Sequence, residues 1–331
     1  MPLVDTFGRT IRYLRVSVTD RCNFRCHYCR PAEGIALAEQ EEILSLEEMA
    51  RLVRLFTELG VERVRLTGGE PLLRRNVMEL IETLGALPGL EDLSLSTNAL
   101  LLARHARGLR EAGVGRVNIS LDSLNPETFF TITRNGRLDT VLAGIDAAVA
   151  AGLGPVKVNM VVMRGINDSE ITAMVDFARE KGVILRFIET MPVGEAGQEV
   201  VDRFMPAEEI LQVVKEHAGS ELIPVKISRG AGPARYYRIS GSTAEVGVIS
   251  ALSQHFCEGC NRVRLTSQGS LVLCLGRVDS VDLKTPLRNG ASDEEMKTRI
   301  QAAIDTKPMG HQFDAETPKS GSNHRMSALG G

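Results

Sequence analysis

Six strand-like segments alternate with helix-like segments over residues 11–192 of this chain. The strand-like segments span residues 11–19, 61–69, 90–98, 115–123, 154–163 and 183–192, and a helix over 206–218 ends the series. Strands that are separated by helices favour a parallel sheet with the helices on its outside. The sequence therefore predicts an α/β fold, in which ligands bind at the carboxyl ends of the strands.

Most of these strands carry polar side chains on one face and apolar side chains on the other. Arg15, Arg65 and Lys157 each lie between two apolar residues of a strand, and Ser96 follows Leu95. The interior of a closed eight-stranded barrel is filled with branched apolar side chains, and the strands of a doubly wound sheet are apolar on both faces. The pattern instead predicts an incomplete TIM-like barrel, a (β/α)6 fold, with a wide polar lumen.

The pattern changes after residue 220. Short strand-like segments follow, which we expect to pair antiparallel, with a hairpin turn at Gln268-Gly269 and a helix near 292–305. We therefore predict two domains, which are a partial barrel over residues 1–219 and a carboxy-terminal α+β extension over 220–331. The extension is expected to cover the open side of the barrel.

Composition and charge narrow the class of protein. The net charge is −3 among 331 residues, so the chain is not a polycation built to bind nucleic acid. The amino-terminal residues lack the apolar run of a signal peptide, and no segment approaches the roughly 18 apolar residues of a membrane span. We therefore expect a cytoplasmic protein, a monomer or homodimer, that binds neither nucleic acid nor membranes.

All six cysteines fall into two groups of three. The first trio is Cys22, Cys26 and Cys29, and the second trio is Cys257, Cys260 and Cys274. In a reducing compartment, such grouped thiols favour metal sites over disulfides. Thiolates bind both zinc and iron–sulfur clusters, so zinc with His27 or His255 as a fourth ligand is an alternative at each site. A [4Fe-4S] cluster held by three cysteines would leave one iron open to a small molecule.

Several cations face the predicted lumen. Arg262 and Arg264 follow the second trio's CEGC segment and alternate onto one face of a strand, as solvated surface arginines also would. Several cations that face one lumen are costly without an anion, however, and guanidinium groups suit phosphates. Together with Arg15, Arg65 and Lys157, they predict a polyphosphate site, so we expect a nucleotide substrate.

Longer stretches of the sequence resemble known families. The first trio, CNFRCHYC over residues 22–29, resembles the radical S-adenosylmethionine (SAM) superfamily, as does the TGGEP segment over 67–71, although a tight turn would also use that glycine pair. The chain resembles the GTP 3′,8-cyclase (MoaA-type) family of molybdenum-cofactor biosynthesis in YLRVSVTDRCNFRCHYC, RLTGGEPLLR, VNISLDSL, FIETMPVG, FCEGCNRVRLTSQGSLVLCL and MSALGG. The resemblance implies a radical SAM partial barrel, with SAM and two [4Fe-4S] clusters, one held by each trio.

The resemblance also implies roles for single residues. The SAM contacts would be Tyr28, Gly69, Ser120 and Met191. The GTP contacts would be Arg15, Arg65, Ser96, Lys157, Arg262, Val263 and Arg264. A carboxy-terminal tail with Arg325, Gly330 and Gly331 is expected to enter the active site and assist radical formation.

The implied reaction begins with a 5′-deoxyadenosyl radical made from SAM, which removes a hydrogen atom from ribose C3′ of GTP. The C3′ radical attacks C8 of guanine, and reduction and protonation give (8S)-3′,8-cyclo-7,8-dihydroguanosine 5′-triphosphate. The second cluster would bind the purine through its open iron. The expected partners are an electron donor of flavodoxin or ferredoxin type and a downstream cyclic pyranopterin monophosphate synthase.

Two other functions compete with this one. A radical SAM enzyme that modifies peptides or proteins would usually carry more cysteines in its second half than the three found here. A zinc-stabilised module that binds a nucleotide or nucleic acid would contain zinc without iron or acid-labile sulfide. Metal and sulfide analysis of anaerobically purified protein therefore separates the zinc alternative from both iron–sulfur enzymes.

Overall fold

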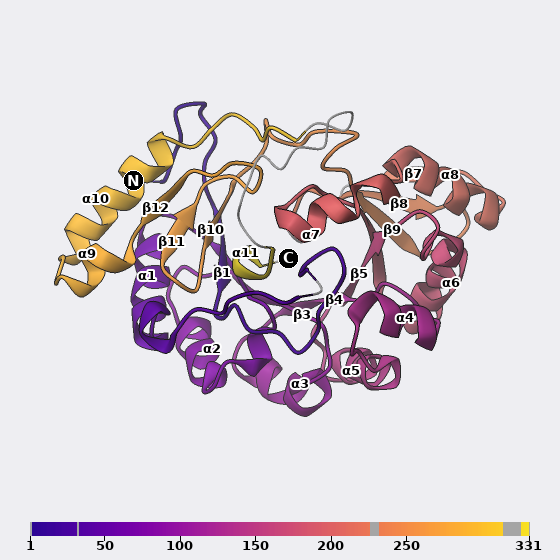
Figure 1. Ribbon diagram of the computed structural model, residues 1–331, viewed down its shortest axis with the longest axis horizontal. Coiled ribbons are helices and arrows are strands. Elements are labelled where there is room, and N and C mark those ends of the chain that lie inside the picture. Colours follow the sequence, from indigo (N-terminus) through magenta and orange to yellow (C-terminus); the bar gives the residue numbers. More distant parts are fainter. Residues whose placement is uncertain (1, 32, 226–231, 314–325, 331) are drawn as a thin grey trace.

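The structure, a computed structural model, describes residues 2–31, 33–225, 232–313 and 326–330. Its strands form one curved sheet around a central space, and most of its helices lie on the outer side of that sheet (Figure 1). The two end strands of the sheet have one neighbour each, so the described strands do not close into a barrel. The expected incomplete α/β barrel is confirmed.

Six parallel strands in chain order form the centre of the sheet. They are β1 (Tyr13–Ser17), β2 (Arg63–Thr67), β3 (Asp92–Thr97), β4 (Arg116–Ser120), β5 (Lys157–Val162) and β6 (Ile184–Glu189). The helices between them are α1 (Leu46–Glu58), α2 (Val77–Gly85), α3 (Leu102–Glu111), α4 (Pro126–Thr133), α5 (Leu138–Ala150) and α6 (Ile171–Lys181). Each of the six strands lies within the segment that the sequence predicts for it.

Carboxy-terminal strands extend this sheet at both edges. Beyond β1 lie β10 (Arg262–Leu265), β11 (Ser270–Val272) and β12 (Ser280–Asp282), and beyond β6 lie β9 (Glu245–Ile249), β8 (Arg235–Ile239) and β7 (Leu222–Val225). The expected antiparallel pairing is found within each of these groups, and Gln268-Gly269 lies in the turn between β10 and β11. The expectation is wrong where they meet the centre, because β9 pairs parallel with β6 and β10 pairs parallel with β1. Both edges of the central sheet thereby gain hydrogen-bonding partners.

The remaining helices lie in the last 140 residues or so of the chain. They are α7 (Gly194–Glu199), α8 (Ala207–Ala218), α9 (Lys284–Arg288), α10 (Asp293–Asp305) and α11 (Met326–Leu329). Short 3-10 turns span Gln40–Glu42, Pro71–Leu73, Asp168–Glu170 and Val201–Arg203. Unlike the outer helices, α11 lies within the curve of the sheet (Figure 1). None of the helices in the described ranges is long and apolar enough to cross a membrane.

Local sequence signals explain where several of these helices begin. The Ser45 side chain accepts a hydrogen bond from the Glu48 N–H, and the Glu48 carboxylate accepts one from the Ser45 N–H. This capping box starts α1. At the start of α4, Asn125 accepts two backbone N–H groups, and Pro126 occupies the first helical position, where no N–H is needed.

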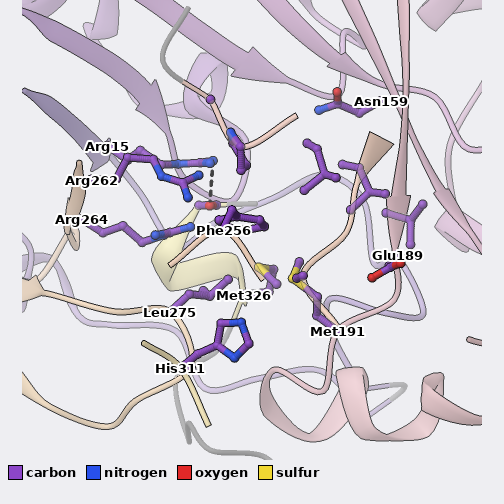
Figure 2. Close-up of a pocket in the computed structure, with 18 of the residues that line it drawn as sticks. Arg15, Asn159, Glu189, Met191, Phe256, Arg262, Arg264, Leu275, His311 and Met326 are labelled. Carbon is purple, nitrogen blue, oxygen red and sulfur yellow. Dashed lines mark hydrogen bonds between the residues drawn. The ribbon is translucent and has the colours of Figure 1, made fainter. Parts of the chain in front are cut away.

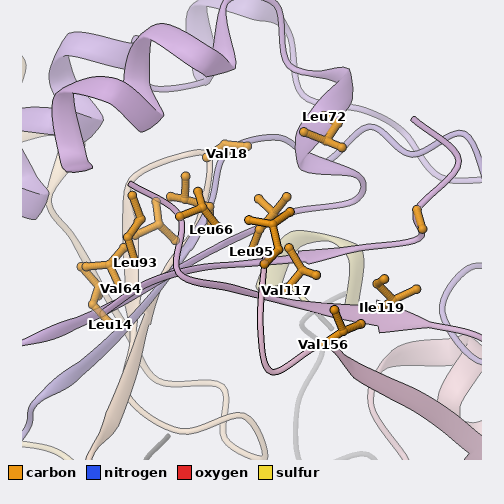
Figure 3. Packing of buried hydrophobic residues seen from close by; sticks show 14 of the residues in the cluster. Leu14, Val18, Val64, Leu66, Leu72, Leu93, Leu95, Val117, Ile119 and Val156 are labelled. Atoms are coloured by element: carbon orange, nitrogen blue, oxygen red, sulfur yellow. The ribbon is translucent and has the colours of Figure 1, made fainter. Parts of the chain in front are cut away.

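The main hydrophobic core lies between the sheet and the outer helices (Figure 3). Leu14, Val64, Leu95 and Ile119, from four adjacent strands, are all completely buried in it. Because successive side chains of a strand point to opposite faces, the residues next to these positions point toward the inside of the curve. The core therefore orients the polar side chains of the strands toward the lumen.

Candidate active site

The first trio lies on the loop that follows β1, at the carboxyl end of the strand. The backbone N–H groups of Arg25 and His27 each donate a 3.0 Å hydrogen bond to the end of α4, at the carbonyls of Thr133 and Ile132. The loop is therefore fixed at the edge of the sheet where ligands bind in folds of this class.

The three thiols of the first trio lie close enough to influence one another. Burial raises the pKa of Cys22, and burial together with Asp122 and the other two cysteines raises the pKa of Cys26 well above its ordinary value. Burial and Cys22 raise the pKa of Cys29 to about 12. Three thiolates in so apolar a place need positive charge beside them, which the irons of a cluster supply. This donor set fits a [4Fe-4S] cluster.

Gly69 packs against the segment that leads into the first trio. Its N–H donates to the Thr19 carbonyl at 2.7 Å, and a Cβ atom at this position would collide with the Arg21 carbonyl oxygen. Glycine alone allows two backbones to approach so closely. The fully buried carboxylate of Glu70 accepts hydrogen bonds from three groups and holds the turn that follows.

The second trio joins the turn before β10 to the end of β11. The Cys260 N–H donates to the Cys257 carbonyl at 3.0 Å. Burial acts to raise the pKa of Cys260, but Arg262 and Lys307 outweigh it and bring this pKa down to about 7. Burial raises the pKa of Cys274. The three thiols line the same pocket and, like the first trio, fit a cluster that takes three cysteines.

The described residues contain no set of ligands for a single zinc ion. Across the parts of the chain that the structure describes, no group of three or more His, Cys, Asp or Glu side chains could hold a single metal ion. A zinc ion needs ligands that converge on one point, whereas a cubane holds each cysteine on a separate iron. His255, a suggested fourth ligand, instead has its Nδ1 atom 3.1 Å from Nε2 of His311.

One large pocket occupies the lumen (Figure 2). It encloses about 1500 Å³ of space, which includes the solvent at its open mouth. The predicted site residues that line it are Arg15, Tyr28, Arg65, Ser96, Ser120, Met191, Cys257, Cys260, Arg262, Arg264, Cys274 and Gly330. Figure 2 shows the arginines reaching in from one side, with Met191 on the opposite side. The structure thus brings most of the predicted SAM and GTP contacts into one cavity.

Three arginines form a row across the inner face of the sheet. Arg15 of β1 stands in register with Arg65 of β2 on one side and with Arg264 of β10 on the other. Adjacent strands are about 4.8 Å apart, so the three side chains leave the sheet next to one another. Burial lowers the pKa of Arg65 and of Arg264 to about 10 each, and burial and Arg264 lower that of Arg15 well below its ordinary value. Like charges in such a row repel, so this arginine row favours a bound anion.

Arg186 of β6 is a lumen cation that the sequence analysis missed. Its Nε donates to Asn159 Oδ1 at 2.8 Å and its Nη2 to Asn118 Oδ1 at 2.6 Å, and it lines the pocket. Lys157 lies nearby on the neighbouring strand, where its Nζ is 3.2 Å from the Tyr236 hydroxyl. The signal was present in the sequence, because Arg186 lies between two apolar residues of a strand, as Arg15 does.

The chain's carboxyl end reaches the arginine row. Arg15 Nη2 donates to the Gly330 carbonyl at 3.0 Å, the dashed bond of Figure 2. Gly330 has a φ of +74°, and a Cβ atom there would collide with Thr67 at the end of β2. The other two predicted tail residues, Arg325 and Gly331, lie outside the described residues.

Besides Lys157, which is not among the lining residues, two further predicted contacts lie apart from the pocket lining. Val263 pairs with Leu14 and is completely buried in the main core, so only its backbone is available to a nucleotide. Gly69 supports the loop of the first trio, as described above, through its backbone. Both positions can therefore act through main-chain atoms alone.

Comparison with known proteins agrees with this architecture. A family model described as the radical SAM superfamily matches residues 16–178, and one described as Molybdenum Cofactor Synthesis C matches residues 183–313. A solved structure of Streptococcus suis SuiB bound to its precursor peptide SuiA has a TM-score of 0.61. It covers 96% of this chain and 76% of SuiB at 14% identity, so it shows the shared fold alone.

Curated relatives match along the whole chain. A protein of Hydrogenovibrio crunogenus named GTP 3′,8-cyclase is 52% identical over 332 residues, which cover 100% of each chain. A protein of Listeria monocytogenes serovar 1/2a with the same name is 43% identical over 334 residues, which cover 99% of each chain. This chain belongs to the GTP 3′,8-cyclase family of radical SAM enzymes.

Proposed function

We propose that this chain is a radical SAM enzyme that converts GTP to (8S)-3′,8-cyclo-7,8-dihydroguanosine 5′-triphosphate, the first step of molybdenum-cofactor biosynthesis. The observation that carries the proposal is the row of Arg264, Arg15 and Arg65 in a pocket that the second trio also lines. A row of guanidinium groups matches a triphosphate, and the trio beside it leaves room for a ligand on its cluster. Relatives with this activity in their name match the chain from end to end.

The first trio would hold one [4Fe-4S] cluster and the second trio another. With SAM, the first cluster supplies one-electron chemistry that yields a carbon radical. Tyr28, Ser120 and Met191, which line the pocket, would hold SAM, and the Gly69 backbone would shape the loop of the first trio. The Tyr28 hydroxyl donates to Asp122 at 2.7 Å, which fixes the orientation of its ring.

The cations of the lumen would bind and orient the nucleotide. The arginine row, Lys157 and Arg186 would supply fixed positive charge for the triphosphate, and Ser96, two residues along β3 from the register partner of Arg65, would add a hydroxyl in the pocket. Leu275 and Phe313 contribute apolar surface to the pocket. A largely enclosed site keeps water away from radical intermediates, which protects them from side reactions.

The proposal also assigns a role to each of the two predicted domains and names the partners of the protein. Residues 1–219 would form the partial barrel with the first cluster, and residues 220–331 would form the carboxy-terminal domain with the second cluster and the Gly-Gly tail. A flavodoxin- or ferredoxin-like protein would deliver the electrons, and a cyclic pyranopterin monophosphate synthase would take the product. All of these proteins would work together in the cytoplasm.

Anaerobic turnover tests the proposed function. Reconstituted protein with SAM, dithionite and GTP should give 5′-deoxyadenosine and a cyclised nucleotide, because the radical is spent on the substrate. Both products are measured by chromatography and mass spectrometry, and a reaction without GTP is the control. If 5′-deoxyadenosine forms at the same rate without GTP and no new nucleotide appears, the substrate assignment is wrong.

Arg186→Met should weaken GTP binding. A hydrogen bond to a charged group contributes about 1.5–3 kcal/mol, so we expect the dissociation constant for GTP to rise about 10- to 100-fold. The matched control is Arg179→Met, because Arg179 lies exposed on α6 and pairs with Asp176 at 2.9 Å. Equilibrium dialysis under anaerobic conditions measures both proteins. An equal loss of SAM binding in Arg186→Met would contradict a specific role in holding GTP.

A further inference from the structure

Lys307 is a buried lysine beside the second trio that the proposed mechanism does not use. It follows the end of α10, and only 2% of its surface is exposed. Its Nζ donates to the carbonyl of Leu273, the residue directly before Cys274. A buried ammonium group is costly unless something nearby stabilises its charge, so its position calls for an explanation.

Among the groups that act most strongly on Lys307, only Cys260 and Cys274 carry negative charge, and they do so only as thiolates. Burial lowers the pKa of Lys307, and the thiolates of Cys260 and Cys274 are the groups that act to raise it. Arg9 and Arg262 also act on it, and they lower its pKa further. Lys307 therefore shares one buried site with the second trio, which it contacts through the Leu273 carbonyl.

Each cysteine of the second trio has a cation of its own. Arg9 donates to the Cys257 carbonyl at 2.9 Å, and Arg262 Nη2 lies 4.0 Å from Cys260 Sγ. Lys307 donates to the carbonyl of Leu273, which directly precedes Cys274. These cations come from distant parts of the chain, so the second trio is held by segments at both ends of the sequence.

The three cations differ in how much of their positive charge acts on the second trio. Arg9 forms an ion pair of 2.6 Å with Asp5, and both side chains are buried, so their charges largely cancel. Arg262 lines the pocket, where a bound nucleotide would share its charge. Lys307 forms no salt bridge among the residues that the structure describes. Its positive charge is therefore available to act on the second trio.

The first trio has a different electrostatic environment. Acidic Asp122 acts on Cys26 and acidic Glu70 acts on Cys22, and in both cases the carboxylate raises the thiol pKa. Arg30 acts in the opposite direction on Cys22 and Cys29. The first trio thus combines one nearby cation with two acidic groups, whereas the charged side chains that act most strongly on Cys260 and Cys274, other than these two thiols, are the cations Arg262, Arg264 and Lys307.

We propose that Lys307 is a positioning residue of the second cluster, which fixes the segment that carries Cys274 and stabilises the reduced cluster with its positive charge. Reduction adds one negative charge to the cluster, and a buried cation nearby makes that addition more favourable. Net charge and hydrogen bonding around a cluster are among the factors that set its potential. The inference rests on the proposed second cluster but not on GTP as the substrate.

Redox titration of Lys307→Met tests the proposal. The full-length protein with both clusters is titrated anaerobically without nucleotide, and electron paramagnetic resonance follows each cluster. Proteins in which one trio is changed to serine assign the two signals. We expect the midpoint potential of the second cluster to fall and that of the first to stay unchanged. Lys307→Arg, which keeps the charge, should retain the wild-type potential.

The controls separate charge from damage to the fold. Lys215→Met removes a lysine that is 43% exposed and pairs with Glu221, so it should change neither potential. A Lys307→Met protein that loses the second cluster while Lys307→Arg keeps it at the wild-type potential also supports the proposal. An unchanged second potential in fully loaded Lys307→Met overturns it, and so does an equal fall in Lys307→Arg. Wild-type protein with only one cluster would instead refute the two-cluster assignment.

Discussion

Cys274→Ser protein should still cleave SAM but should form no cyclised nucleotide. Cys274 belongs to the second trio and lines the same pocket as the arginine row, whereas the first trio lies on the loop that follows β1. A thiolate is the ligand form of cysteine, and a serine hydroxyl does not ionise at neutral pH, so the second cluster loses a ligand. We expect cyclisation to fall at least about 100-fold, which corresponds to about 2.7 kcal/mol of transition-state free energy.

Two measurements make this result specific. Iron and sulfide analysis should show about half the wild-type content, because one of two four-iron clusters remains. Production of 5′-deoxyadenosine reports on the first cluster in the same sample. The corresponding variant of the first trio, Cys26→Ser, should form neither 5′-deoxyadenosine nor cyclised product. Full cyclisation by Cys274→Ser would show that the second trio has only a structural role.

Gly330→Ala should displace the carboxyl end from the arginine row and slow the reaction. The added Cβ atom would meet the Thr67 side chain, and a φ of +74° is unfavourable for any residue other than glycine. Backbone strain of this kind costs about 1–3 kcal/mol, so we expect a loss of roughly tenfold or more in the rate of GTP cyclisation. Binding of SAM, measured separately, should change little.

Gly182→Ala is the matched control for this experiment. Gly182 ends α6 with a φ of +64°, and a Cβ atom there would have no neighbour within 4 Å. The control therefore carries similar backbone strain without a collision in the pocket, and it should keep the wild-type rate. In the double variant Gly330→Ala with Thr67→Ala, removal of the Thr67 side chain should restore part of the activity. A wild-type rate in Gly330→Ala would show that the position of Gly330 between Thr67 and Arg15 is not needed for catalysis.

The barrel and its polar lumen were predictable from the sequence because they depend on local patterns. Alternation of polar and apolar residues identified six strands, and it placed Arg15, Arg65 and Lys157 on the inner face. The same rule applied to residues 183–192 would have identified Arg186. The cysteine spacing indicated two metal sites without any knowledge of the fold. The predicted roles of the single SAM and GTP contacts stay predictions.

Features that depend on distant segments were not predictable in this way. The arginine row requires β10 to pair parallel with β1, although about 250 residues separate them along the chain. Short strands after residue 220 favour antiparallel hairpins by their local pattern, and nothing in that pattern reveals that two of them fill the edges of the barrel. Lys307 and Arg9 were missed for a related reason, because each is a single cation in an irregular segment.

The insertion of β9 and β10 beside β6 and β1 has a consequence for how the protein is made. Domains fold from the amino terminus as the ribosome extends the chain, so the six central strands emerge first, with both sheet edges unpaired. Unpaired edges favour association between chains. Arg264, the last member of the arginine row to be synthesised, arrives with the strand that covers one of those edges. The pairing of β10 with β1 therefore both covers one sheet edge against aggregation and completes the nucleotide site of the newly made chain.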